Sequence, residues 1–253
     1  MEIVPLGVGD AFAKTLYQTN FLVRPADGEP FLVDCGHTAS RALRALGLEL
    51  RAVPRVLVSH LHADHIGGLE ELGFAGYFGW GLRPRLYVPE NLLPWLWPHA
   101  LEAGMGQRLR GDEGFFEARL ETYFEVTALA GGGAFDLGSV RVTPFPTPHV
   151  PGRPSWGFRL EDRATGGRVL LTCDTRFHPK TLDAFGADAD AVFHDCQFVT
   201  NGAHIHATLD ELQTLPEAWH ERLLLVHYAD DWPEHAHRLG RLRLAEQGRV
   251  YRF

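Results

Sequence analysis

Short apolar runs separated by turn residues dominate the first half of the chain and predict strands rather than long helices. The runs that predict strands here are Glu2–Leu6, Asn20–Arg24, Phe31–Val33, Val56–Val58 and Leu86–Val88. Between the third and fourth runs, Thr38 or Ser40 can cap a helix that ends at Gly47. This half therefore combines several strands with a helix, as in an α/β protein.

The second half restarts the strand pattern after a glycine run at 131–133. Its predicted strands are Val140–Thr143, Trp156–Leu160, Val169–Thr172, Ala191–His194, Leu223–Val226 and, at the end, Arg249–Phe253. Two segments, Thr208–Leu215 and His235–Glu246, predict helices. Two strand-rich halves indicate two sheets packed face to face with helices outside, and no repeat of 20 to 50 residues is present.

The segment from Pro89 to Glu125 is irregular, because prolines and glycines interrupt a series of aromatic side chains. These aromatics are Trp95, Trp97, Phe115, Phe116, Tyr123 and Phe124. We expect short helices that form a lid or wall over a site, although any single aromatic could equally fill the core.

Length and composition narrow the class of protein. A chain of 253 residues with 45% hydrophobic and 22% charged positions fits one globular domain, 1–253. No apolar run approaches the roughly 20 residues of a membrane span, and no signal peptide is visible. Three cysteines argue against a disulfide framework, so a cytoplasmic location is expected. The net charge of −8 disfavours non-specific nucleic-acid binding.

Four potential metal ligands follow the Val56–Val58 strand within six residues: His60, His62, Asp64 and His65. Imidazole and carboxylate groups bind divalent first-row ions, with zinc favoured first and manganese or iron as alternatives. Since alternate side chains share a side in an extended segment, His60 and His62 can reach one ion and the other two a second. The motif predicts a site with two metal ions.

Several other apolar runs also end on an acid or a histidine. These end positions are Asp34, Asp174, His194 with Asp195, and His227. If the carboxyl ends of the strands share one edge, as in open α/β sheets, these side chains collect beside the histidine motif. Asp34 is expected to orient the His60–His65 loop by accepting hydrogen bonds.

At the H-x-H-x-D-H motif the sequence resembles the metallo-β-lactamase superfamily. The resemblance implies an α/β fold of the αββα sandwich type, with two mixed β-sheets flanked by helices. It also supplies three further ligands, His149, Asp174 and His227, in the segments TPH, TCDT and LVHY. One ion would then bind His60, His62 and His149, and the other Asp64, His65 and His227, with Asp174 between them.

Around these ligands the chain resembles the phosphodiesterase side of the superfamily, near ribonuclease Z and the small cyclic-nucleotide phosphodiesterases. The segments concerned are Asp34–Gly36, Pro154–Phe158 and His204–Thr208. In that group a histidine in an H-x-T setting, here His206, supports proton donation to the leaving oxygen, with Asp195 as its acid partner. The residues expected to be catalytic are therefore Asp64, His206 and Asp195.

Two dications and two carboxylates leave the site with a net charge of about +2, so an anionic substrate is favoured. A water that bridges such ions has a pKa near 7 and supplies hydroxide at neutral pH. We therefore expect a dinuclear hydrolase of phosphodiesters.

Only 25 positions separate His149 from Asp174, too few for the exosite arm of a tRNA-processing enzyme. This spacing favours a small or cyclic phosphodiester or a nucleotide-type substrate over folded tRNA. Enzymes of the superfamily are often dimers, so a homodimer is compatible with the resemblance. Two alternatives remain open, a lactone or thioester hydrolase of the same fold and a non-catalytic metal-binding accessory protein.

Overall fold

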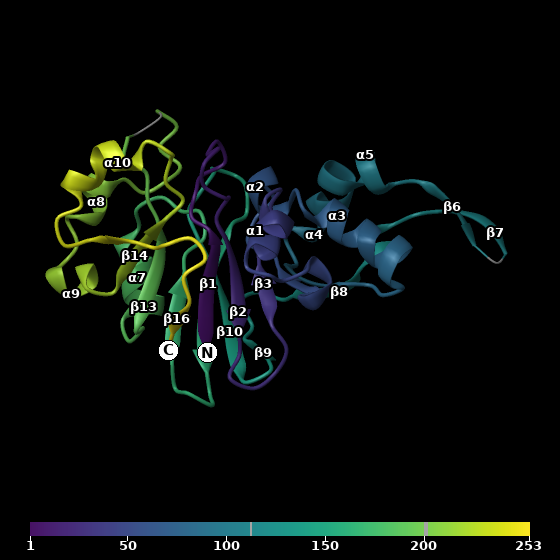
Figure 1. Cartoon of the computed structure of the whole chain (residues 1–253), viewed down its shortest axis with the longest axis horizontal. Coiled ribbons are helices and arrows are strands. Elements are labelled where there is room, and N and C mark those ends of the chain that lie inside the picture. The colour runs from purple at the N-terminus through teal and green to yellow at the C-terminus, as the bar shows by residue number, and fades with distance from the viewer. Residues whose placement is uncertain (112, 200–201) are drawn as a thin grey trace.

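Two seven-stranded sheets lie face to face in the computed structural model, and helices cover their outer faces (Figure 1). The structure describes residues 1–111, 113–199 and 202–253. This arrangement confirms the predicted αββα sandwich with two mixed sheets. Among the residues described, no helix has the length and apolar character needed to cross a membrane.

The first sheet has the strand order β16-β1-β2-β3-β4-β5-β8. Its strands are β1 Glu2–Gly7, β2 Asn20–Arg24, β3 Phe31–Val33, β4 Arg55–Leu57, β5 Arg85–Pro89, β8 Glu125–Leu129 and β16 Tyr251–Arg252. Pairing is antiparallel from β16 to β3 and parallel from β3 to β8. The carboxyl ends of β3 and β4 therefore lie side by side.

The second sheet, β15-β14-β13-β12-β11-β10-β9, follows the same plan. Its strands are β9 Phe135–Leu137, β10 Val140–Pro146, β11 Trp156–Asp162, β12 Arg168–Leu171, β13 Ala191–Asp195, β14 Leu223–Val226 and β15 Arg243–Leu244. Pairing is antiparallel from β9 to β12 and parallel from β12 to β15. The carboxyl ends of β12, β13 and β14 consequently share one edge.

Short helices flank both sheets. Those of the first half are α1 Ala39–Ala45, η1 Leu50–Ala52, α2 Ala63–Ile66, α3 Leu69–Phe74, η2 Ala75–Trp80, α4 Leu93–Leu96, η3 Trp97–Leu101, α5 Glu102–Met105 and α6 Leu120–Tyr123. Those of the second half are α7 Pro179–Gly186, α8 Leu209–Leu212, α9 Glu217–His220, α10 Trp232–His235 and η4 Ala236–Arg238. The first group lies beside the first sheet and α7 to α10 beside the second (Figure 1).

Alternation along the central strands explains the two apolar layers on either side of the first sheet. Phe21, Val33 and Leu57 face the second sheet, and the ring of Phe21 meets Phe193 across the interface at 5.4 Å between centroids. The neighbouring residues Leu22, Leu32 and Val56 point to the helical layer instead. Both faces of these strands are buried, so they appear in the sequence as continuous apolar runs.

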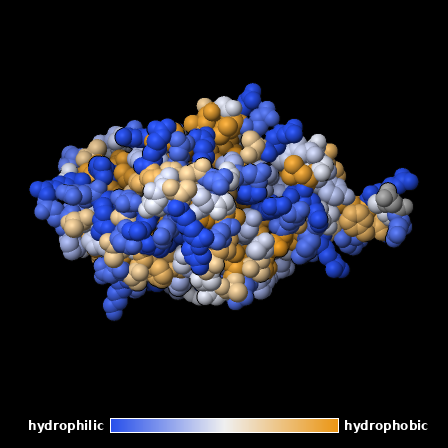
Figure 2. Space-filling view, turned by 90° about the horizontal axis from the view of Figure 1, so that it is seen from below, coloured by the Kyte–Doolittle hydropathy of each residue, from blue (hydrophilic) through white to orange (hydrophobic). Residues whose placement is uncertain are grey.

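A projecting hairpin was not predicted. It consists of β6 Arg108–Gly111 and β7 Gly114–Glu117, and it extends from the body at the end occupied by the first helical layer (Figure 1). Phe115 and Phe116 on β7 are 64% and 39% exposed, and apolar surface is visible near this projecting end (Figure 2). The aromatic segment therefore forms short helices, as expected, together with an exposed hairpin.

The predicted helix His235–Glu246 is wrong. Helix α10 begins earlier, at Trp232, and the chain passes through η4 to Gly240, which has a left-handed φ of 59°. Arg243 then pairs with Leu224 as an edge strand of the second sheet. The short strands β8, β9 and β15 were not predicted either, because two to five residues give little pattern on their own.

The predicted side-chain cap at the start of α1 does not form. Thr38 occupies the N-cap position, but its hydroxyl accepts the N–H of Gln18 at 2.8 Å and makes no capping bond. Ser40 lies inside the helix and donates to Glu71. At α8, by contrast, Thr208 caps the helix through a capping box, although this helix ends at Leu212, before the predicted Leu215.

Candidate metal centre

The candidate site lies where the carboxyl ends of β3 and β4 meet those of β12, β13 and β14 from the opposite sheet. Three residues just beyond these strands, Asp34, Cys173 and His227, have left-handed φ values of 65°, 50° and 63°. Non-glycine residues adopt this conformation at a cost of about 1–3 kcal/mol, and such residues cluster at functional sites.

The first set of potential ligands contains the side chains of His60, His62, His149 and Asp174. Their ligand atoms all lie within 4.8 Å of one another. His149 Nε2 and His62 Nδ1 are 3.2 Å apart, and His60 Nε2 is 3.6 Å from Asp174 Oδ2. The structure thus brings together the four residues assigned to the first ion.

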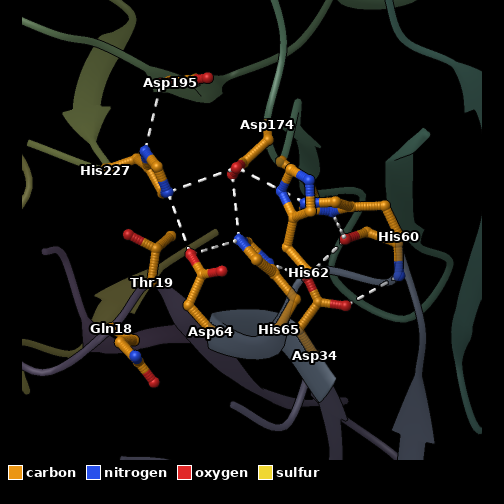
Figure 3. A network of polar contacts seen from close by, with 12 residues as sticks. Gln18, Thr19, Asp34, His60, His62, Asp64, His65, Asp174, Asp195 and His227 are labelled. Atoms are coloured by element: carbon orange, nitrogen blue, oxygen red, sulfur yellow. Dashed lines mark hydrogen bonds and ion pairs between the residues drawn. The ribbon is translucent and has the colours of Figure 1, made fainter. Parts of the chain in front are cut away.

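The second set contains Asp64, His65, Asp174 and His227, all of them buried. His65 Nε2 is 3.2 Å from a carboxylate oxygen of both Asp64 and Asp174. His227 Nε2 lies 3.4 Å from Asp64 and 3.3 Å from Asp174. Asp174 belongs to both sets and stands between them, as predicted for the bridging residue (Figure 3).

Unpartnered buried atoms indicate that this donor set fits metal ions. Within the described ranges, both carboxylate oxygens of Asp174 and the Nε2 atoms of His60 and His65 make no hydrogen bond although they are buried. Burying polar atoms without partners costs free energy, so natural proteins rarely leave several together. A pair of divalent cations would satisfy all of these atoms at once.

Asp34 supports the histidine loop as expected. One of its oxygens accepts the Ser59 N–H at 2.8 Å, and the other contacts the Ser59 hydroxyl at 2.6 Å and His65 Nδ1 at 2.8 Å. The Ser59 hydroxyl also lies 3.0 Å from His60 Nδ1. These contacts fix the ring orientations so that both Nε2 atoms face Asp174 (Figure 3).

The carboxylates control the charge of the buried imidazoles. Burial alone lowers the pKa of His227, but Asp174 and Asp64 outweigh it and raise the pKa to about 10. Burial likewise opposes the charge of His65, whose pKa is nevertheless raised by Asp174, Asp64 and Asp34. For His60 burial prevails and the pKa is lowered. Since metal ions bind deprotonated imidazole, loading this site would release protons.

His206 and Asp195 form a hydrogen-bonded pair beside the two potential ligand sets. His206 Nδ1 is 2.7 Å from Asp195 Oδ2, and the imidazole stacks on His227 with centroids 4.7 Å apart. Asp195 is fully buried and also accepts the Thr175 N–H at 2.8 Å. Burial lowers the pKa of His206, but Asp195 more than compensates and raises it. The geometry is that of an imidazole held by a buried carboxylate, an arrangement that favours the protonated form of the ring.

A pocket with a volume of about 300 Å³ opens beside the first ligand set. Its walls come from α4 and η3 and from the loop that follows His149. Of the predicted wall aromatics only Trp95 lines it. Trp97 packs in the helical layer with the buried Tyr123 and Phe124, and the remaining two aromatics project on the β6–β7 hairpin. The predicted wall over the site is therefore present, but fewer of the aromatic side chains contribute to it than the sequence indicated.

Sequence reasoning missed several supporting residues. Ser59 joins Asp34 to His60, and Asn20 joins the Gly36 N–H to the Asp64 carbonyl. The backbone carbonyl of Ile205 accepts a hydrogen bond from His149 Nδ1 at 2.8 Å. No sequence motif marks these positions. Ser59 alone could have been suspected, because it directly precedes His60 in the chain.

Solved structures of known proteins share this architecture. The metallo-β-lactamase fold protein YhfI from Bacillus subtilis matches with a TM-score of 0.77 and 19% identity, over 99% of this chain and 98% of that one. A diphosphatase of the PhnP family gives 0.76 and 20%, covering 100% and 97%. Yeast PDE1 gives 0.67 and 13%, covering 98% of each chain. The fold is accordingly the metallo-β-lactamase fold.

Relatives identified by sequence share a higher identity with this chain than these structures do. Proteins named anti-Pycsar protein Apyc1 share 38% identity in Saccharibacillus brassicae, over 99% of both chains, and 36% in Paenibacillus harenae, also over 99% of both. The protein of that name from Bacillus phage 010DV004 shares 36%, over 99% of this chain and 98% of its own. The family model described as anti-Pycsar protein Apyc1 matches residues 1–251. The chain therefore belongs to the anti-Pycsar protein Apyc1 family.

Proposed function

We propose that this protein is a dinuclear metal-dependent phosphodiesterase that acts on a small or cyclic phosphodiester. The observation that carries the proposal is the His206–Asp195 pair, 2.7 Å apart, beside two ligand sets that share Asp174. The metal ligands alone would suit any hydrolase of this fold. A buried acid–imidazole pair adds a proton donor, which an alkoxide leaving group requires. Among the proteins that share the fold, one is named PDE1 and another is a diphosphatase.

In this proposal His60, His62 and His149 would hold one ion, Asp64, His65 and His227 would hold the other, and the carboxylate of Asp174 would be available to both. Zinc is the first candidate, with manganese or iron as alternatives. Bound divalent ions would activate water and neutralise negative charge on a phosphodiester. Asp64 and Asp174 provide only two negative charges to the pair, so the centre retains affinity for an anion despite the protein's net charge of −8.

His206 then donates its proton to the leaving oxygen. Asp195 favours the protonated imidazole and fixes its ring, because its carboxylate accepts from Nδ1 and leaves Nε2 to face the substrate. The Thr175 N–H holds the carboxylate in turn. Asp195 is therefore a positioning residue that acts through His206.

The pocket supports a small substrate. Its volume of about 300 Å³ is at the lower end of the roughly 300–1,000 Å³ typical of small-molecule sites. A folded tRNA would need a broad basic surface, whereas acidic residues outnumber basic ones by 32 to 24 in this chain. We therefore propose a mononucleotide-sized phosphodiester as substrate.

The first test is hydrolysis of bis(p-nitrophenyl) phosphate and of a 3′,5′-cyclic nucleotide by protein reloaded with zinc or manganese. We expect metal-dependent turnover that Asp64→Ala abolishes, because this substitution removes a ligand of the second ion. Asp183→Ala, which removes an exposed carboxylate on α7, is the matched control and should keep full activity. Full metal occupancy without turnover of either ester would refute the proposal and favour the lactone, thioester or non-catalytic alternatives.

A further inference from the structure

The fully buried carboxylate of Asp195 has one oxygen that its pairing with His206 does not use. Its Oδ2 atom accepts the Thr175 N–H and contacts His206 Nδ1, whereas Oδ1 makes no hydrogen bond within the described residues. Oδ1 lies 3.6 Å from Nδ1 of His227, which in the same part of the chain is also buried without a hydrogen bond (Figure 3). Two buried polar atoms that lack other partners thus face each other.

Strand pairing in the second sheet places these two side chains together. Asp195 ends β13 and is paired with Val226, the last residue of β14, so that His227 follows directly beside it. The Cys196 N–H donates to the Val226 carbonyl at 2.9 Å and extends the pairing by one residue. His227 then turns out of the sheet with a left-handed φ of 63°, a conformation that persists in non-glycine residues where the surrounding structure enforces it. Backbone pairing therefore maintains the approach of the two side chains.

Three other histidines of the ligand sets have a partner on the nitrogen that faces away from the site. These pairs are His65 Nδ1 with Asp34 at 2.8 Å, His60 Nδ1 with the Ser59 hydroxyl at 3.0 Å, and His149 Nδ1 with the Ile205 carbonyl at 2.8 Å. Such outer contacts fix the tautomer and the orientation of a metal-binding imidazole. His227 points Nε2 at the carboxylates of the second ligand set, so its outward nitrogen is Nδ1, and the carboxylate that faces this atom is Asp195.

His206 and His227 present their Nδ1 atoms to the same carboxylate. Their rings are stacked, with centroids 4.7 Å apart and an angle of 19° between the planes. One oxygen of Asp195 is 2.7 Å from His206 Nδ1, and the other is 3.6 Å from His227 Nδ1. Because an ionised carboxylate accepts hydrogen bonds at both oxygens, Asp195 can hold both rings at once.

We propose that Asp195 positions the metal ligand His227 as well as the proton donor His206. Its Oδ1 atom accepts the Nδ1–H of His227 and so directs Nε2 towards the second ion. The separation of 3.6 Å is longer than a hydrogen bond, and a small shift of the ring would close it. The inference rests on the dinuclear site of the proposed function and adds to it a determinant of metal affinity. One carboxylate then ties the proton donor to the metal centre.

Metal affinity tests the inference without any turnover. Metal-free protein is titrated with cadmium in competition with a chelator of known affinity, and cadmium NMR distinguishes the two ions because their ligand sets differ in the number of imidazoles. Asp195→Ala should lower the affinity for the second ion about 10- to 100-fold, the usual effect of removing the outer partner of a ligand. The affinity for the first ion should change less than twofold.

His206→Ala separates the two roles of the carboxylate. This variant lacks the proton donor but keeps Asp195 Oδ1 as the acceptor for His227, so the affinity for the second ion should stay within twofold of the unmodified protein. Asp183→Ala, which removes an exposed carboxylate on α7, is the matched control and should bind both ions normally.

Three results of this titration would overturn the inference. Unchanged affinity for the second ion in Asp195→Ala would show that His227 needs no outer partner. Equal losses at both ions would show that the negative charge of Asp195 acts on the whole site and that its contact with His227 does not matter. A loss in His206→Ala as large as that in Asp195→Ala would show that stacking of the two rings holds His227.

NMR of the histidine side chains in the unmodified, zinc-loaded protein gives an answer even if Asp195→Ala does not fold. The Nδ1–H of His227 should give a resolved signal that exchanges slowly with water, because a buried carboxylate accepts it. Rapid exchange of this proton, or zinc bound through Nδ1, would overturn the inference. Failure of the unmodified protein to bind a second ion would instead refute the dinuclear site of the proposed function.

Discussion

Removing His206 should damage catalysis in proportion to how much the leaving group needs a proton. Within the residues that the structure describes, the hydrogen bond between Nδ1 and Asp195 Oδ2, at 2.7 Å, is the only one that the His206 imidazole makes. It is half-buried and stacks on His227 with centroids 4.7 Å apart. His206→Ala therefore removes a proton donor and leaves the proposed ligand sets in place.

The size of the effect follows from the leaving group. Proton donation by a positioned imidazole accelerates reactions by about 10²- to 10⁴-fold when the departing oxygen is a strong base. We expect a loss of this size in kcat for cyclic nucleotides, whose leaving group is a ribose alkoxide. The p-nitrophenolate ion leaves without a proton, so the loss for its esters should stay below about tenfold.

The assay is a series of methyl aryl phosphates with phenols of increasing pKa, measured with both proteins at full metal occupancy. The slope of log kcat/KM against phenol pKa should be shallow for the unmodified protein and steep for His206→Ala. Parallel lines would show that His206 gives no proton to the leaving group and would refute the assignment. His178→Ala, which removes an exposed imidazole, should leave the slope unchanged.

Asp195→Asn tests the positioning role in the same series. A hydrogen bond to a charged group contributes about 1.5–3 kcal/mol, so its loss should slow alkoxide substrates by about 10- to 150-fold. Burial lowers the pKa of His206 and Asp195 raises it, so the substitution should lower that pKa. The alkaline limb of the rate profile, where the donor loses its proton, should move to lower pH. An unmoved limb would contradict the pairing.

Three further outcomes are expected. Asp34→Asn should lower metal affinity about 10- to 100-fold by titration with zinc, because it removes the charged acceptor that orients His65. Burial raises the pKa of Asp162, but two backbone N–H donors outweigh it and hold the pKa at about 2, below the ordinary 3.8. Asp162→Ala should therefore destabilise the fold by about 2 kcal/mol near neutral pH, and the difference should fade as the pH falls from about 4 towards 2. Phe193→Ala should cost about 3–5 kcal/mol in denaturant unfolding, against less than about 0.5 for the exposed Phe78→Ala.

The sequence alone predicted the sandwich, which the structure confirms, and it also marked the residues that the structure gathers in the two potential ligand sets. Strands such as β3 and β4 are buried on both faces, so their apolar runs stand out, and the ligands follow them directly. His60, His62, Asp64 and His65 lie so close in the chain that any fold would keep them together. The other ligands, such as His149, could be assigned only through the resemblance to a known superfamily.

Tertiary structure decided what the sequence pattern left open. The pairing of Asp195 with His206 depends on contact between the end of β13 and a loop eleven residues further along the chain, and the pocket beside the first ligand set lies between α4 and the loop after His149. The sequence predicts a helix over His235–Glu246, but Gly240 breaks it and pairing with β14 makes Arg243–Leu244 a strand. The spacing of residues along the chain indicates only the helix or strand to which they belong. Contacts between distant segments form when the whole chain packs, so the local sequence does not predict them.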